Sequence, residues 1–139
     1  MSPDLPAYVL DSYALLAYLS AEPGSTHLQE LFSLAQKGRC HLYLCLINLG
    51  EVLYLTERRR GLDKAQRVLA LVENLPLELL DAPRELILDA AHIKANYPIS
   101  YADAFAVAAA LHQHAVILTG DPEFAVVEQI VKVEWLPKV

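Results

Sequence analysis

Short apolar runs that alternate with helical segments constrain the fold of this chain more than any other feature of its sequence. Five runs have the length and character of buried strands: 8–10, 39–44, 75–80, 115–119 and 131–135. Segments with helical spacing separate them: 14–19, 25–36, 47–60, one that starts at residue 63, 83–96, 101–114 and 122–129. Strands separated throughout by helices predict an α/β fold with a central, mainly parallel sheet.

The length of the chain predicts one domain that spans residues 1–139. A chain of 139 residues that is 55% hydrophobic can bury one core but is too short for two ordinary domains. No apolar run approaches the roughly 18 residues that a membrane-spanning helix needs, and the start lacks the features of a signal peptide. We therefore expect a cytoplasmic protein with no membrane partner.

Charge limits the ways in which this chain could bind nucleic acid. The formal net charge is -6, which argues against a surface that is basic all over. Any contact with nucleic acid must come from a local basic patch or from metal ions. The only dense basic patch starts at Arg58, Arg59 and Arg60, which could reach phosphates. Alternatively, these arginines complement the dipole at the end of a helix and keep it soluble.

Four carboxylates lie in apolar surroundings, unlike the other acids of the chain. Asp11 directly follows the first predicted strand, and Asp121 repeats this placement after the run 115–119. Asp103 is the only charge in an alanine-rich helix, and Glu51 lies mid-helix on an otherwise apolar stripe. Asp103 and Glu51 are therefore expected to point toward the interior.

A structural role is available for three of these acids. Asp11 and Asp121 are both good helix N-caps, and Asp103 has capping-box spacing from Ser100. Glu51 has no capping role, and an unpaired buried carboxylate costs several kcal/mol or stays protonated. Each cap alone is unremarkable, so the case for a site depends on the four acids together.

Parallel sheets bring strand ends and the first turns of the following helices to one edge. Asp11, Asp103 and Asp121 all have such positions, so with Glu51 they would form a cluster of four carboxylates. Such a cluster repels itself unless a cation neutralises it, and carboxylate oxygens are the ligands that Mg²⁺ or Mn²⁺ prefers. Metal ions held in this way suit the hydrolysis of a phosphodiester by an activated water.

Four sequence blocks resemble a known family. They are Val-Leu-Asp-Ser at 9–12, Ile-Asn-Leu-Gly-Glu-Val at 47–52, Ile-Ser-Tyr-Ala-Asp-Ala-Phe at 99–105, and Ile-Leu-Thr-Gly-Asp-Pro-Glu-Phe at 117–124. In this order they resemble the PIN-domain nucleases, and within them the VapC-type toxins of toxin-antitoxin pairs. The last two blocks are the most specific. The resemblance implies a three-layer PIN-like fold and a Mg²⁺- or Mn²⁺-dependent endoribonuclease.

The resemblance also implies roles for individual residues. The catalytic acids would be Asp11, Glu51, Asp103 and Asp121, of which Asp11, Asp103 and Asp121 would ligate metal. Ser12 and Thr119 match hydroxyl positions that support the site in relatives, and Glu123 lies where some relatives carry a further acid. The implied partners are an RNA substrate, a cognate antitoxin and a second copy of the chain in a homodimer.

Two residues depart from the family pattern. Tyr13 stands where relatives usually have a small or polar residue, and Asn48 lies where they often carry a hydroxyl.

One alternative function keeps the PIN fold as a catalytically weak module that binds protein or RNA. The other is a phosphatase with Asp11 as nucleophile, which would need a second acid soon after the first. Ser12, Tyr13 and Ala14 follow Asp11 instead of an acid, so this alternative is the least favoured.

Overall fold

The computed structural model describes residues 5–137, so both ends of the predicted 1–139 domain lie outside the described residues. Its sheet has five parallel strands in the order β3-β2-β1-β4-β5. The strands are β1 (Ala7–Leu10), β2 (His41–Cys45), β3 (Glu78–Leu80), β4 (Val116–Thr119) and β5 (Val133–Trp135). The helices are α1 (Ser12–Leu19), α2 (Ser25–Gln36), α3 (Leu46–Arg60), α4 (Leu62–Glu73), α5 (Arg84–Asn96), α6 (Tyr101–His112) and the 3-10 helix η1 (Pro122–Val127).

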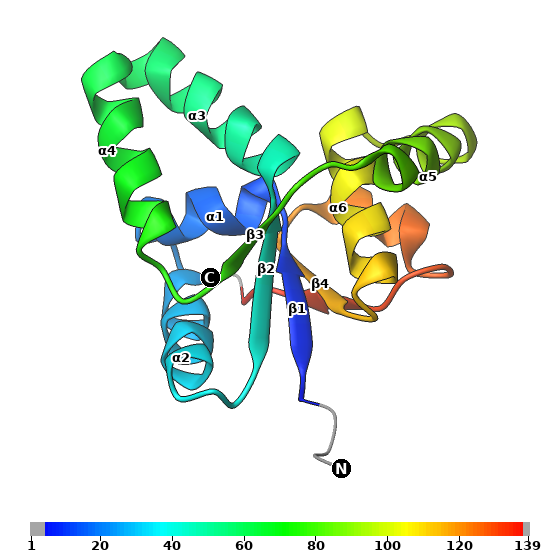
Figure 1. Ribbon diagram of the computed structural model, residues 1–139, viewed down its shortest axis with the longest axis horizontal. Coiled ribbons are helices and arrows are strands. Elements are labelled where there is room, and N and C mark those ends of the chain that lie inside the picture. Colours follow the sequence, from blue (N-terminus) through cyan, green and yellow to red (C-terminus); the bar gives the residue numbers. More distant parts are fainter. Residues whose placement is uncertain (1–4, 138–139) are drawn as a thin grey trace.

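Helices cover both faces of this sheet, which confirms the predicted three-layer α/β fold (Figure 1). Because successive strand side chains alternate between faces, Val9 and Ile117 enter the core shared with α5 and α6. Leu10 and Leu118 enter the other core, which α1, α2, α3 and α4 cover. The near-continuous apolar character of the strands thus reflects burial on both faces.

Helix α6 is buried around most of its circumference. Its eight consecutive residues from Asp103 to Ala110 are all buried, and six of them, five alanines and one valine, are small enough to allow close packing. This placement explains why a charge in its first turn is conspicuous. Across residues 5–137, no helix is both long enough and apolar enough to cross a membrane.

Three predicted elements are shorter than expected because of local hydrogen bonds. The run 75–80 forms a strand only over its last three residues, since Leu77 donates its backbone N–H to Leu75 in a turn. The run 131–135 forms a strand only from Val133, because Val131 still bonds to Val127 of the preceding turn. The predicted helix 122–129 is the shorter 3-10 helix η1.

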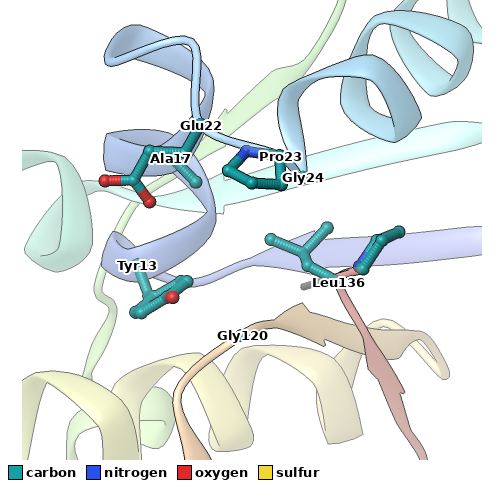
Figure 2. A pocket seen from close by; sticks show the side chains of 8 residues that line it. Tyr13, Ala17, Glu22, Pro23, Gly24, Gly120 and Leu136 are labelled. Carbon is teal, nitrogen blue, oxygen red and sulfur yellow. The ribbon is translucent and has the colours of Figure 1, made fainter. Parts of the chain in front are cut away.

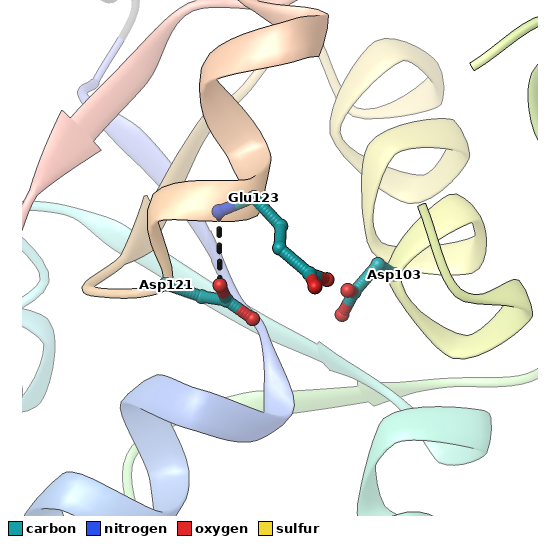
Figure 3. Close-up of side chains that lie close together, drawn as sticks. All are labelled: Asp103, Asp121 and Glu123. Carbon is teal, nitrogen blue, oxygen red and sulfur yellow. Dashed lines mark hydrogen bonds between the residues drawn. The ribbon is translucent and has the colours of Figure 1, made fainter. Parts of the chain in front are cut away.

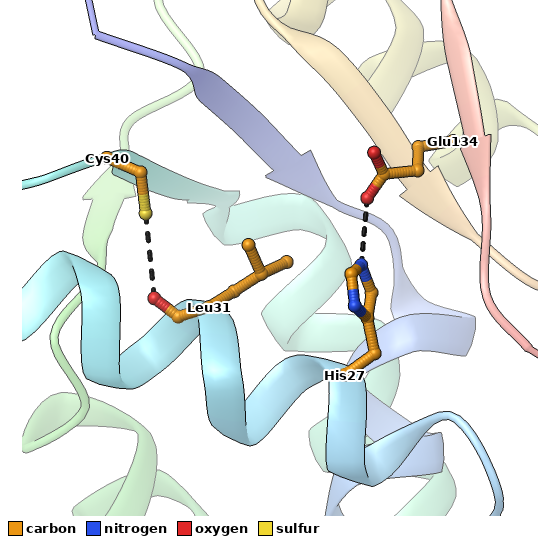
Figure 4. Close-up of polar contacts among 4 residues, drawn as sticks. All are labelled: His27, Leu31, Cys40 and Glu134. Carbon is orange, nitrogen blue, oxygen red and sulfur yellow. Dashed lines mark hydrogen bonds and ion pairs between the residues drawn. The ribbon is translucent and has the colours of Figure 1, made fainter.

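A polar contact connects α2 to the edge strand β5 (Figure 4). His27 Nε2 lies 2.9 Å from the Glu134 carboxylate, and both side chains are partly exposed. One turn further along α2, the Leu31 carbonyl accepts the thiol of buried Cys40 at 3.5 Å. Strand β5 is thereby held against α2, just before the chain reaches Leu136 near the carboxyl edge of the sheet. An exposed contact of this kind stabilises the fold by about 1 kcal/mol at most.

Candidate functional site

The carboxyl ends of β1 and β4 form the centre of the candidate site. From β1, the chain builds β2 and β3 on one side of the sheet and later β4 and β5 on the other. Ligands in parallel α/β sheets bind at such a switch point, outside the carboxyl ends of the strands. Asp11 follows β1, and Asp121 follows β4 after a single glycine, so both acids lie at this point as predicted.

Asp11 is both the N-cap of α1 and a buried member of the site. Its Oδ1 accepts the backbone N–H of Ala14 at 2.8 Å, and its Oδ2 accepts the Thr119 hydroxyl at 2.5 Å. The residue is only 1% exposed. Burial, with smaller effects of Asp103 and Asp121, raises the pKa of Asp11 from 3.8 to about 7, although its two hydrogen bonds oppose this.

Asp103 is the second buried acid. The Ser100 hydroxyl caps α6 by accepting the backbone N–H of Asp103 at 3.1 Å, which confirms the predicted cap and fixes the first turn. Burial raises the pKa of Asp103 from 3.8 to about 6, the charges of Asp121, Glu51 and Glu123 add to this increase, and the Ser100 hydroxyl opposes it. Asp103 is therefore surrounded by carboxylates, and a cation would relieve the repulsion.

Three carboxylates form a tight group at this edge (Figure 3). One oxygen from each of Asp103, Asp121 and Glu123 lies within 4.8 Å of the others. Asp121 Oδ1 accepts the backbone N–H of Glu123 at 2.9 Å, and this cap turns the Glu123 side chain toward Asp103. The Thr119 hydroxyl accepts the backbone N–H of Asp121 at 3.0 Å while donating to Asp11. Thr119 thus connects the acids that follow β1 and β4.

Glu51 lies beside this group but is less buried than predicted. It is half-buried, and its charge contributes to the raised pKa of Asp103. The expectation that it points into the interior is wrong, because its neighbours Ile47 and Tyr54 are 38% and 50% exposed. The face of α3 that enters the core is a different one, formed by Asn48, Leu49 and Val52. Glu51 therefore borders the open side of the site.

Asn48, which departs from the family pattern, is a buried residue of the site whose contacts the sequence did not predict. It is 0% exposed, and its Nδ2 donates to the Ser12 hydroxyl at 3.2 Å and to the Ala102 carbonyl at 3.0 Å. It therefore joins the start of α1 to the residue before Asp103, and lies one turn before Glu51 on α3. Among the described residues, its Oδ1 is a buried side-chain oxygen with no hydrogen-bond partner.

We predict that Asn48→Ala destabilises the protein by about 1 to 3 kcal/mol, because two buried hydrogen bonds are lost and the Ala102 carbonyl loses a donor. Urea denaturation will measure the change. Asn96→Ala is the matched control, since the Asn96 side chain bonds only to the His92 carbonyl at an exposed helix end. Equal and small effects of the two substitutions would contradict the role assigned to Asn48.

The other predicted residues have clear positions. Ser12 is buried, and its hydroxyl donates to the backbone carbonyl of Asn48 at 3.4 Å. Arg58, Arg59 and Arg60 are exposed at the end of α3, away from the carboxylate group. Arg58 stacks over the Tyr54 ring at 5.2 Å from its centroid. The site therefore joins the acids with Ser12 and Thr119, but the arginines lie outside it.

The donor set of the site fits a hard divalent cation. The candidate ligands are all carboxylate oxygens, and both buried acids have pKa values raised toward neutrality. Oxygen ligands of this kind suit Mg²⁺ and Mn²⁺, whereas zinc sites usually contain histidine or cysteine. Bound metal would favour the ionised carboxylates that burial and mutual repulsion disfavour.

The chain shares its fold with several solved structures. The chain is 17% identical to VapBC2 from Rickettsia felis, with a TM-score of 0.74 over 94% of this chain and 99% of that one. It is 21% identical to VapBC from Salmonella typhimurium, with a TM-score of 0.70 over 94% and 98% of the two chains. It is 17% identical to VapC20 from Mycobacterium tuberculosis, a toxin that cleaves the sarcin-ricin loop, with a TM-score of 0.70 over 94% and 99%.

The sequence itself was also compared with curated proteins and with family models. No curated protein matches it significantly. The family model described as PIN domain matches residues 8–130, which contain all the acids of the site. This match covers most of the chain and agrees with the parallel sheet and with the blocks identified in the sequence. The chain therefore belongs to the PIN domain family.

Proposed function

We propose that this protein is a metal-dependent endoribonuclease that hydrolyses RNA phosphodiester bonds, and that residues 1–139 form its single PIN domain. The observation that carries the proposal is the approach of Asp103, Asp121 and Glu123 within 4.8 Å at the switch point of a PIN-domain sheet. Asp11 and Glu51 lie beside them. Metal-assisted hydrolysis uses water as the nucleophile, so a site made of carboxylates needs no histidine, cysteine or lysine nucleophile.

The acids would divide the work according to how firmly each is positioned. Asp11, Asp103 and Asp121 would hold the metal, because they lie at fixed positions set by caps and by the Thr119 hydroxyl. Glu51, which is half-buried on the open side, would orient the attacking water. Bound Mg²⁺ or Mn²⁺ would supply the charge that activates the water and stabilises the leaving oxygen. Glu123 would join the metal-binding acids.

RNA, an antitoxin and a second copy of the chain are the proposed partners. One similar structure is a toxin that cleaves the sarcin-ricin loop, another is a toxin-antitoxin complex, and a third is a member of the VapBC family of toxin-antitoxin systems. Arg58, Arg59 and Arg60 would contact phosphates of the RNA. They follow Glu51 by seven to nine residues on α3, which corresponds to about 10 to 14 Å along the helix. We further propose that the protein acts in the cytoplasm.

RNA cleavage by the purified protein tests this proposal. Total RNA incubated with the protein in Mg²⁺ or Mn²⁺ should acquire defined new ends, which sequencing of the ends will map. Excess EDTA should remove these ends, because the clustered carboxylates then hold no cation. RNA binding without metal-dependent cleavage would instead support the module that only binds. If the protein neither binds nor cleaves RNA, both functions are contradicted.

A further inference from the structure

A pocket of about 200 Å³ opens next to the carboxylate group and takes no part in the chemistry described above (Figure 2). It lies between the start of α1, the turn after α1, the turn after β4 and the segment after β5. Its lining residues are Tyr13, Ala17, Glu22, Pro23, Gly24, Gly120, Leu136 and Pro137. Two of them adjoin the site directly: Tyr13 is two residues after Asp11, and Gly120 precedes Asp121.

Tyr13 is held in place by its close approach to Gly120. A Cβ atom on residue 120 would lie 2.4 Å from Tyr13 Cε1, so any other residue here would displace the ring. Tyr13 is nevertheless 38% exposed and borders the pocket. An aromatic ring that is fixed on one side and open on the other presents a ready surface for stacking. Burial in the core therefore does not explain this tyrosine.

The other walls of the pocket suit a flat, mostly apolar ligand. Pro23 and Leu136 form one side, where Gly24 packs so closely that an added Cβ would lie 3.2 Å from Leu136. Glu22 is exposed at the rim, on the same side as Tyr13 in the close-up view (Figure 2). An ionised carboxylate only accepts hydrogen bonds, so this rim favours a ligand that carries N–H donors.

We infer that this pocket binds one nucleobase of the RNA next to the scissile phosphate, with Tyr13 stacking on the base and Glu22 accepting a hydrogen bond from its amino group. The inference rests on the proposed function, because the position beside Asp11 and Asp121 makes the pocket a neighbour of the reacting phosphate. Adenine, cytosine and guanine carry an exocyclic amino group, whereas both exocyclic groups of uracil are carbonyl oxygens and its only N–H donor is the ring N3–H. The pocket thus disfavours uracil at this position.

Cleavage of a randomised single-stranded RNA pool in Mg²⁺ tests the inference, with the ends read by sequencing. The unaltered protein should cleave next to adenine, cytosine or guanine in preference to uracil. Tyr13→Ala should lose this preference and raise KM by about 5- to 160-fold, the range that stacking of one base contributes to affinity. Tyr13→Phe should retain both. Glu22→Gln should admit uracil, because an amide can also donate, whereas Glu30→Gln on α2 should change nothing.

The outcomes separate this inference from the proposed function. Cleavage by the unaltered protein, with an unchanged base preference in Tyr13→Ala and Glu22→Gln, would overturn the pocket and leave the nuclease intact. If no RNA is cleaved, the binding of free nucleosides still tests whether the pocket holds a nucleobase. The backbone amide NMR signals of Gly24 and Gly120 should move with cytidine, adenosine or guanosine and less with uridine. No movement with any of the four nucleosides, or equal movement with all four, would overturn the inference.

Discussion

In the absence of metal, Asp11→Asn will make the protein more stable at pH 8, by on the order of 2 kcal/mol. Burial raises the pKa of Asp11 from 3.8 to about 7, so the ionised carboxylate is costly in the folded state. Asparagine keeps the shape and can still accept the Ala14 N–H, so the helix cap survives. The substitution removes the cost of the charge and leaves the packing in place, but the asparagine Nδ2 cannot accept the Thr119 hydroxyl, and the loss of this hydrogen bond reduces the gain.

The sign of this effect fixes its pH dependence. Because the folded pKa of Asp11 lies above the unfolded value, its contribution to stability is complete below about pH 4 and is lost as the pH rises through about 7. Urea denaturation in EDTA should therefore show the unaltered protein losing stability between pH 5 and pH 8. Asp103, whose pKa is raised to about 6, adds to the loss in the same direction. Asp11→Asn should lose less stability than the unaltered protein over the same pH range.

A divalent cation should reverse the loss. Millimolar Mg²⁺ or Mn²⁺ should stabilise the unaltered protein at pH 8, since it binds the folded carboxylate group, and Asp11→Asn should respond less. Asp81→Asn, at an exposed acid outside the site, is the matched control and should behave like the unaltered protein. A stability in EDTA that stays constant from pH 5 to pH 8 would show that the buried acids carry no such cost.

Local sequence pattern was enough to place three of the acids. Asp11 and Asp121 each follow a buried strand, and Asp103 stands three residues after a capping serine, so short-range rules located all three at one edge of the sheet. The caps turned out to be part of the site, because the same hydrogen bonds fix the acids. The alternating strands and helices likewise predicted the fold.

Other parts of the site depend on contacts that short-range rules do not contain. The contacts of Asn48 do not follow from its place in the sequence, since its partners Ser12 and Ala102 are 36 and 54 residues away. Glu51 was assigned to the interior from an apolar stripe, yet that stripe borders the open edge, where apolar residues stay exposed. The approach of Glu123 to Asp103 follows from the 3-10 turn, which the sequence suggested only as a helix.

Asp103→Asn will reduce RNA cleavage by more than the roughly 10- to 100-fold that loss of a supporting residue around a metal site costs. Asp103 lies close to Asp121, Glu51 and Glu123, so its loss weakens the whole group. The variant should still fold, because the Ser100 cap uses only the backbone N–H of residue 103. Circular dichroism and urea denaturation will confirm this.

The rate of RNA cleavage in Mg²⁺ by the unaltered protein and by Asp103→Asn tests most directly whether the carboxylate group is a metal-dependent nuclease site. Asp81→Asn, at an exposed acid outside the site, is the control. We predict that the unaltered protein and Asp81→Asn cleave RNA at the same rate, that EDTA stops both, and that Asp103→Asn is more than about 100-fold slower. Equal rates for Asp103→Asn and the unaltered protein, with both folded, would contradict the assignment of this site.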